Sequence, residues 1–332
     1  MKIAIVKLSA LGDIVHAMVV LQFIKKFNRN IIIDWVVDEK FKDLLKLNPY
    51  INEVHSINLS NIKKKKSFFL LIKELKRFQK FSSYDLVIDM QGLIKSAIIA
   101  NLIPSKKTIG FDKFSSREKL SSFFYNKTFS YDYDKNVILR NISLIEFALG
   151  FKIEERHIHH KARFLFSNIK NLDIHFAKTK KNILLIPGAS HVTKRYSVSK
   201  LAEITKKLSA NFYIIWGNEE EKSLALKIKD LSPEINICKK LMLDELICLI
   251  TKVDLVIGPD TGPTHMAWAL NKPSITLFGP TPGYRNVYET SINKILESNS
   301  TVNPLKINKK DHSIDEIKAE DIAQLAQKIL FS

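Results

Sequence analysis

The residues best suited to chemistry lie in a short segment rich in glycine and proline, Gly258–His265. It follows an apolar run at Asp254–Ile257, which predicts a buried strand, and it precedes a helical pattern. The N-terminus of a helix offers free N–H groups and the positive end of its dipole, and both bind anions. Asp260 and Thr261 could bind the hydroxyls of a sugar or ribose, or they could cap the helix in a rigid turn.

A second candidate segment, Ser9–Asp13, follows the first apolar run of the chain and leads into an amphipathic helical pattern. Gly12 would let a ligand approach the backbone closely. Asp13 stands at the predicted turn from strand to helix, where it is either a helix N-cap or a catalytic carboxylate. The segment has a single glycine, so it lacks the fingerprint of a dinucleotide-binding loop.

Two further loops are expected at the same edge of a sheet as the segment around Asp260. Gly188–Arg195 contains Ser190 and Lys194, and Gly279–Gly283 is again rich in glycine and proline. Ligands of open α/β sheets bind at the carboxyl ends of the strands. Hydroxyl groups, a lysine and a helix dipole that converge there would suit a diphosphate.

The elements that must position these loops repeat one pattern in both halves of the chain. Continuous apolar runs that predict buried strands lie at 2–7, 31–37, 85–89, 182–186, 212–216, 235–238, 254–257 and 274–278. Helical patterns separate them, which predicts an α/β protein with parallel sheets covered on both faces. We expect an N-terminal domain at 1–165, a C-terminal domain at 175–313 and a final helix at 314–332.

Composition narrows the class of protein. The chain has 332 residues, 45% of them hydrophobic, and a formal net charge of +18. A polyanion-binding protein, a membrane-surface protein or an enzyme with an acidic substrate would each fit this charge. Only eight of the 52 basic residues are arginine, the residue that best recognises phosphates and base edges, so we expect no dedicated nucleic-acid binding. Neither a signal peptide nor a membrane span is expected, which favours the cytoplasm.

Metal binding is not expected. Cys238 and Cys248 support neither a disulfide framework nor a metal signature. Asp132-Tyr133-Asp134 spells a metal-holding tripeptide, but it lies away from a clear strand end, and the three histidines at His157–His160 have no accompanying cysteine or carboxylate pattern. Lys63–Lys66, beside Phe68-Phe69, is either a solvated loop or a binding patch.

Four segments in register carry a family resemblance: Val6–His16, Asp89–Ser96, Asp260–His265 and Phe278–Thr281. Together they resemble the bacterial lipopolysaccharide heptosyltransferases, and among these the type I enzymes. The resemblance implies a GT-B architecture, in which two Rossmann-like domains face a central cleft, and an inverting transfer without cofactor or obligatory metal. The implied donor is ADP-L-glycero-β-D-manno-heptose, and the implied acceptor is the Kdo of Kdo-lipid A. Type II or another later-acting transferase is the alternative.

The resemblance also assigns roles to matching residues. Asp13 would be the catalytic base. The C-terminal domain would bind the donor through Ser190, Lys194, Glu221, Met242, Asp260, Thr261, Gly262 and His265. The N-terminal domain would bind the acceptor through Ser9, Gly12, Lys95, Arg117 and Arg140. Glu219 or Glu220 could replace Glu221, and Leu241 could replace Met242.

Two further expectations follow from the resemblance. The final helix at 314–332 would pack back onto the N-terminal domain. The protein would also contact the anionic cytoplasmic face of the inner membrane, which would give part of its positive charge a use. The basic residues assigned to the acceptor would otherwise be ordinary solvated side chains.

Overall fold

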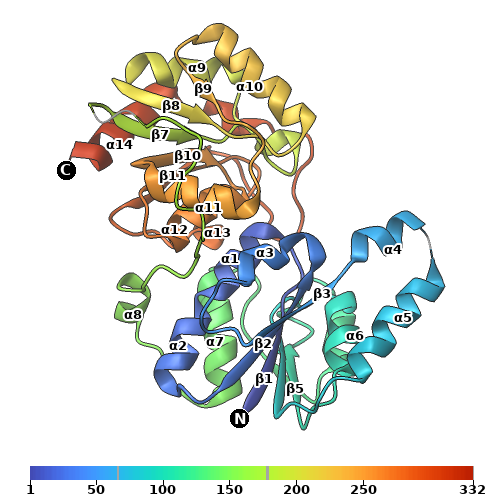
Figure 1. The fold of residues 1–332 in the computed structure, drawn as a ribbon. Helices are drawn as coiled ribbons and strands as arrows, with labels where there is room; N and C mark the ends of the chain where they lie inside the picture. Colours follow the sequence, from blue (N-terminus) through green and yellow to red (C-terminus); the bar gives the residue numbers. More distant parts are fainter. Residues whose placement is uncertain (66, 177–178, 332) are drawn as a thin grey trace. The chain divides into compact units, whose positions relative to one another are not determined.

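The computed structural model of the chain describes residues 1–65, 67–176 and 179–331. Lys66 and the side chains of Lys63 and Phe68 lie outside the described part, so the binding patch considered for Lys63–Lys66 stays an expectation. The chain divides into two compact units, Met1–Phe164 and Leu165–Ser332. The sequence predicted that the N-terminal domain ends at residue 165 and that the C-terminal domain begins at residue 175. Each unit contains one parallel sheet covered by helices (Figure 1).

The first unit has a six-stranded sheet in the order β3-β2-β1-β4-β5-β6, and every pair of neighbouring strands is parallel. Its strands are β1 (Lys2–Val6), β2 (Ile32–Asp38), β3 (Glu53–Ile57), β4 (Leu86–Asp89), β5 (Thr108–Phe111) and β6 (Lys127–Phe129). Its helices are α1 (Leu11–Met18), α2 (Val20–Phe27), α3 (Lys42–Leu45), α4 (Leu59–Lys65), α5 (Phe68–Gln79), α6 (Ile94–Leu102), α7 (Val137–Leu149) and α8 (Glu155–His159), with 3₁₀ turns η1 (Glu39–Phe41) and η2 (Lys119–Phe124).

The second unit repeats this topology in the order β12-β11-β10-β7-β8-β9. Its strands are β7 (Lys181–Leu185), β8 (Ala210–Ile214), β9 (Asn236–Ile237), β10 (Leu255–Pro259), β11 (Ser274–Phe278) and β12 (Asn293–Glu297). Its helices are α9 (Val198–Lys207), α10 (Glu219–Leu231), α11 (Leu243–Lys252), α12 (Gly262–Ala269), α13 (Gly283–Asn286) and α14 (Ala319–Phe331), with 3₁₀ turns η3 (Val192–Lys194) and η4 (Ser313–Glu316).

Both orders are the Rossmann order, counted within each unit. The chain starts each sheet at its centre, builds outward to one edge and then returns to build the other half. The order reverses between β1 and β4 in the first unit and between β7 and β10 in the second. In this fold ligands bind beside the loops that follow the strands at such a reversal, which here are the loops after these four strands.

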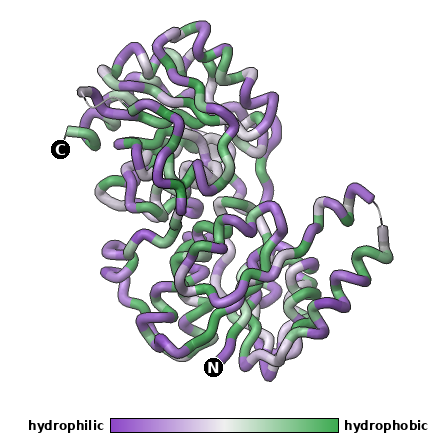
Figure 2. The backbone as a smooth tube through the Cα atoms, viewed as in Figure 1, coloured by the Kyte–Doolittle hydropathy of each residue, from purple (hydrophilic) through white to green (hydrophobic). Residues whose placement is uncertain are grey.

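The strands are apolar throughout because both faces of each sheet are covered. In the first unit Ile3, Ile5 and Trp35 are fully buried, and in the second Ile183 and Ile257 are equally buried. Hydrophobic and hydrophilic residues alternate along the covering helices, as in α10 (Figure 2). In such amphipathic helices this pattern produces the layered packing predicted from the sequence, with an apolar stripe turned toward the sheet, whereas α12 is buried along nearly its whole length.

The last helix, α14, belongs to the second unit. It packs beside α9, and its buried residues Ile322, Ala323 and Ala326 lie in the hydrophobic core formed around Ile183 and Leu185. The prediction instead placed this helix on the N-terminal domain. The reason for the difference is its apolar stripe, which covers one face of the second sheet.

None of the helices within the described ranges combines the length and the apolar character needed to cross a membrane.

Candidate active site

The segment around Asp260 joins the end of β10 to the start of α12 at the centre of the second sheet. Thr261 takes the N-cap position of α12 with an extended backbone, and Gly262 begins the helix. The hydroxyl of Thr264 donates to the carbonyl of Pro259 at 2.9 Å, which closes the turn. The free N–H groups of α12 thus begin at the carboxyl edge of the sheet, where they can hold an anion.

The carboxylate of Asp260 gathers side chains from three other parts of the second unit. Lys194 Nζ lies 2.7 Å from its Oδ2 atom, and His265 Nε2 lies 2.9 Å from its Oδ1 atom. Thr281 Oγ1 donates to Oδ2 at 3.0 Å, and Asn286 Nδ2 donates to the same oxygen at 3.3 Å. The structure therefore brings together the loops after β7, β10 and β11, as the sequence predicted for Lys194, Asp260 and the segment at 279–283.

The charge state of Asp260 follows from these contacts. Burial by itself would raise the pKa of this carboxyl group, but the charge of Lys194 and the hydrogen bond from His265 hold the pKa well below its usual range. Asp260 is therefore ionised at physiological pH. Its charge fixes the ammonium group of Lys194, whose side chain is only 12% exposed, beside the segment that leads into α12.

Glu221 connects two more loops of the same edge. Its Oε2 atom accepts from the N–H of Gly217 at 2.7 Å. A Cβ atom placed on Gly188 would lie 2.4 Å from the Glu221 carboxyl carbon, so only glycine lets this carboxylate lie over the loop after β7. Glu220, one of the alternatives to Glu221, instead pairs with Arg195, with one contact at 2.5 Å and the other at 3.0 Å.

Two other predicted donor residues lie at strand ends with exposed side chains. Ser190 is exposed in the loop after β7. Met242 is 67% exposed in the segment that follows β9, and its N–H donates to Glu245 Oε2 at 2.9 Å at the start of α11. The neighbouring Leu241 is half-buried. Their positions are compatible with contacts to a ligand, and both are accessible.

In the first unit, Asp13 lies in the first turn of α1 rather than at its cap. Ala10 takes the N-cap position, and Asp13 is the third residue of the helix. Its Oδ2 atom reaches back and accepts from the N–H of Ala10 at 3.1 Å. In the part of the chain that the structure describes, its Oδ1 atom has no hydrogen-bond partner, and the side chain is partly exposed. Asp13 therefore serves the helix with one oxygen, Oδ2.

The remaining residues of that loop are partly exposed as well. Ser9 precedes the N-cap position, and Gly12 lies in the first turn of α1. Lys95 is exposed in the first turn of α6, and Arg117 is exposed in the segment after β5. The N–H of Ile94 donates to Glu118 Oε2 at 2.7 Å, so the segments that carry the two basic residues are tied together at the carboxyl edge of the sheet.

Arg140 does not fit the predicted role in acceptor binding. Its residue is only 5% exposed, within α7. The guanidinium donates to the carbonyls of Tyr131 and Asp132, each at 2.5 Å, and of Ser115 at 2.7 Å, and it lies 4.5 Å from the centre of the Phe111 ring. A buried guanidinium needs such partners, and here they tie the segment after β5 to the segment after β6.

Sequence reasoning missed several residues of these sites. Thr281 and Asn286 contact Asp260, and the position of Thr281 after β11 could have indicated this. Asp89 and Gln91 were part of a recognised segment but received no role. Gln91 lies two residues after the end of β4, where the strand order reverses, and it contacts the loop that precedes Asp13. Polarity at such a position is the signal for it.

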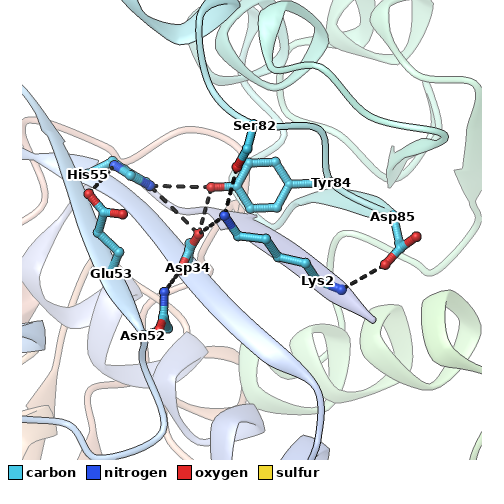
Figure 3. Close-up of polar contacts among 8 residues, drawn as sticks. All are labelled: Lys2, Asp34, Asn52, Glu53, His55, Ser82, Tyr84 and Asp85. Carbon is cyan, nitrogen blue, oxygen red and sulfur yellow. Dashed lines mark hydrogen bonds and ion pairs between the residues drawn. The ribbon is translucent and has the colours of Figure 1, made fainter.

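A separate polar cluster lies on the first sheet (Figure 3). Ligand atoms of Asp34, Glu53 and His55 lie within 4.8 Å of one another, the one such group of three found among the described residues. However, Lys2 Nζ lies 3.1 Å from Asp34 Oδ2, and Tyr84 Oη donates to the same oxygen at 2.7 Å. The ammonium group of Lys2 thus already occupies the place beside this carboxylate that a metal ion would take.

The position of the cluster also separates it from the loop of Asp13. Asp34 lies near the amino end of β2 and pairs in register with Ala4 in the middle of β1, whereas that loop follows the carboxyl end of β1. Burial alone would raise the pKa of Asp34, but hydrogen bonds from His55 and Asn52 help to hold it well below its usual range. The cluster therefore ties strands together as an ionised, fully partnered group.

Comparison with known proteins adds a family to this geometry. The model for glycosyltransferase family 9 (heptosyltransferase) matches residues 70–313. Lipopolysaccharide heptosyltransferase 1 of Campylobacter coli is 40% identical, over 99% of this chain and 99% of its own length. The protein of the same name from Pseudomonas aeruginosa is 26% identical, over 88% of this chain and 82% of its own.

Solved structures agree on the fold. Escherichia coli heptosyltransferase WaaC, determined with ADP, superposes with a TM-score of 0.80 at 21% identity, over 99% of this chain and 100% of its own. E. coli ADP-heptose lps heptosyltransferase II gives a TM-score of 0.72 at 17% identity, over 99% of this chain and 98% of its own. These matches confirm the predicted α/β fold of the GT-B class, with two Rossmann-like parallel sheets.

Proposed function

Because this chain belongs to glycosyltransferase family 9, the heptosyltransferases, we propose that it transfers L-glycero-D-manno-heptose from ADP-L-glycero-β-D-manno-heptose to the Kdo of Kdo-lipid A. This is the first heptose transfer of lipopolysaccharide inner-core synthesis. The proposal is supported by the full-length similarity to a protein named lipopolysaccharide heptosyltransferase 1. The single structural observation that carries it is the Lys194–Asp260 pair at the N-terminus of α12.

The second unit binds the donor. The diphosphate of the ADP moiety lies at the N-terminus of α12, where Thr261 and Gly262 contribute backbone N–H groups and Lys194 contributes an ammonium group. Asp260, held ionised, accepts hydrogen bonds from heptose hydroxyls in addition to its protein partners. Ser190, Glu221, Met242 and His265 complete the donor set around this edge. Glu221, beside Gly188 and Gly217, accepts from the ribose hydroxyls.

The reaction divides between an acid–base step and a charge that must be stabilised. Asp13 Oδ1 accepts the proton of a Kdo hydroxyl as that oxygen attacks the anomeric carbon of the heptose. The bond from the anomeric carbon to the diphosphate breaks, and negative charge grows on the departing ADP. Lys194 and the α12 N–H groups stabilise that charge at its origin, without reorganisation at the moment of transfer.

The first unit binds the acceptor. Ser9 and Gly12 present their backbone beside Asp13, while Lys95 and Arg117 attract the carboxylates of Kdo and the phosphates of lipid A. Arg140 supports this surface indirectly, because its guanidinium holds the segment after β5 through the carbonyl of Ser115. The acceptor is embedded in lipid, so the protein works in the cytoplasm as a peripheral protein on the cytoplasmic face of the inner membrane.

The test is a transfer assay with a panel of acceptors. Purified protein is incubated with ADP-heptose and either Kdo-lipid A or the same acceptor already carrying one heptose, and product masses and released ADP are measured. We expect a mass gain of one heptose on Kdo-lipid A. Transfer to the heptosylated acceptor alone would assign the chain to type II or a later-acting transferase. Salt-sensitive DNA binding without ADP-heptose binding would indicate a polyanion-binding protein instead.

A further inference from the structure

The loop that leads to Asp13 has three successive backbone N–H groups held by two side chains. The N–H groups of Leu8 and Ser9 donate to the side-chain oxygen of Gln91, at 2.9 and 3.1 Å. The N–H of Ala10 donates to Asp13 itself, at 3.1 Å. Gln91 therefore holds the start of this loop, and Asp13 holds its end.

Gln91 can act on this loop because of the strand order. β1 and β4 are adjacent and parallel, and Val6 lies opposite Asp89 in the register. The segments that follow the two strands leave the same edge side by side. Lys7 Nζ donates to the carbonyl of Met90 at 3.0 Å, so the two segments are joined a second time directly before the Gln91 contact.

Gln91 is itself held by a buried carboxylate. Asp89, which is fully buried, accepts from the N–H groups of Gln91 and Gly92 with one oxygen, at 2.8 and 3.3 Å. Its other oxygen accepts from the hydroxyls of Ser96, at 2.8 Å, and Tyr125, at 2.7 Å. Gly92 has a φ of +68°, a conformation that favours glycine and lets this turn wrap around the carboxylate.

The ring of Tyr125 lies over Gly110 of β5, where no side chain separates it from the backbone, and its hydroxyl donates to Asp89. A Cβ atom on Gly110 would lie 2.4 Å from the Tyr125 ring, so a larger residue there would displace the ring. Two oxygens of Asp89 thus receive four donors, and every part of the turn that carries Gln91 is constrained. Such a supporting network holds a reactive group in place more tightly than a single contact does.

We propose that Gln91 is a positioning residue for Asp13: its side-chain oxygen fixes the Leu8–Ser9 backbone from which α1 begins, and Asp89 fixes Gln91 in turn. The side chain of Gln91 sets the direction of the Asp13 carboxylate through the first turn of α1. This inference rests on the proposed function, because it assigns Gln91 to the residue proposed as the base.

The test uses substitutions that separate the hydrogen-bond acceptor from the shape. Gln91→Met keeps the length of the side chain but has no oxygen, and we expect kcat to fall by about 10- to 100-fold, the order of loss that a small misplacement causes. Gln91→Glu keeps an oxygen for both N–H groups and should retain much more activity. KM for both substrates should change little, since neither substrate is bound by the Gln91 oxygen.

A matched control distinguishes this role from a general loss of stability. Gln22 in α2 also holds backbone through its side chain, with Oε1 accepting from the N–H of Ala162 at 2.9 Å. Gln22→Met should lower the urea midpoint of unfolding comparably to Gln91→Met but leave kcat unchanged. Tyr125→Phe, which removes one of the four donors on Asp89, gives a milder variant should Gln91→Met fail to fold.

The decisive result is a double-mutant cycle with Asp13→Asn. If Gln91 acts through Asp13, Gln91→Met or Tyr125→Phe should cost nothing further in the Asp13→Asn background, although each lowers kcat in the wild-type background. Additive losses in the double variants would overturn the inference. So would a kcat equal to that of active wild-type protein in both single variants, Gln91→Met and Tyr125→Phe. Wild-type protein that transfers no heptose at all would instead overturn the proposed function, so the two failures are distinguishable.

Discussion

Lys194 and Asp260 form an ion pair of 2.7 Å in which the two side chains are only 12% and 9% exposed. The pair joins the loop after β7 to the loop after β10, on either side of the point where the strand order of the second sheet reverses. It therefore links the packing of the second unit to the place where its ligand is proposed to bind, and the same contact should affect both stability and catalysis.

Replacement of Lys194 by Met should show this double effect. We expect kcat to fall by about 10²- to 10³-fold, because a preorganised charge on the departing ADP is lost. The free energy of unfolding should also fall by about 3 kcal/mol, since a buried carboxylate loses its counterion. Steady-state kinetics and urea unfolding measure the two effects.

A matched control is the exposed pair Lys207–Glu320 in the same unit, also at 2.7 Å. Lys207→Met should leave kcat unchanged and cost no more than about 1 kcal/mol of stability. Equal effects of the two substitutions would contradict the role of Lys194.

The lowered pKa of Asp260 predicts how stability depends on pH. A carboxyl group with a pKa lower in the folded than in the unfolded protein stabilises the fold above the unfolded value, about 3.9, and this contribution is lost as the pH falls toward the folded value. Between pH 5 and pH 3, roughly, wild-type protein should lose stability more steeply than Asp260→Asn. Urea unfolding of both proteins over this range tests the expectation, and parallel curves would contradict it.

Gly188→Ala should act on donor binding through Glu221. The added Cβ atom would lie 2.4 Å from the Glu221 carboxyl carbon, so this carboxylate must leave its place. We expect KM for ADP-heptose to rise by about 10-fold, the order expected when a hydrogen bond to a charged group is lost. Gly188→Ala should add nothing to Glu221→Ala. A further loss in the double variant would show that Gly188 acts by another route.

Arg117 and Arg140 should separate acceptor binding from stability. Arg140→Met leaves three carbonyl contacts unmade and should lower the free energy of unfolding by about 2–4 kcal/mol. Arg117→Met should instead raise KM for Kdo-lipid A by about 3- to 10-fold, with stability unchanged, because an exposed charge contributes little to folding. A raised KM for Kdo-lipid A with Arg140→Met, together with a loss of stability with Arg117→Met, would contradict these two roles.

Much of the fold could be predicted because the local pattern and the tertiary environment agree. The continuous apolar runs of the central strands predict sheets buried on both faces, and the structure confirms this. The segment around Asp260 could be singled out because glycine, proline and hydroxyl groups after a strand have few structural uses together. The segment after β7 could be grouped with it by the rule for strand ends, and Lys194 does contact Asp260.

The features that could not be predicted depend on contacts between segments that are far apart in the sequence. Arg140 lies on a helix with a mixed pattern, and nothing in its neighbours indicates that its guanidinium binds carbonyls from the segments after β5 and β6. Gln91 acts on Leu8 across 83 positions of the chain, a contact that exists only once β1 and β4 pair. α14 was placed on the first domain because the resemblance implied it, yet its apolar stripe fits the second sheet.

We propose that this chain moves heptose onto Kdo with Asp13 as the base. The most direct test of this proposal is the mass of Kdo-lipid A after incubation with ADP-heptose and either wild-type protein or Asp13→Asn under single-turnover conditions. We predict a gain of one heptose with the wild type and a transfer rate at least about 100-fold lower with Asp13→Asn. An unchanged mass of the acceptor with the wild type would contradict the proposed transfer, and equal rates for the two proteins would contradict the role of Asp13 as the base.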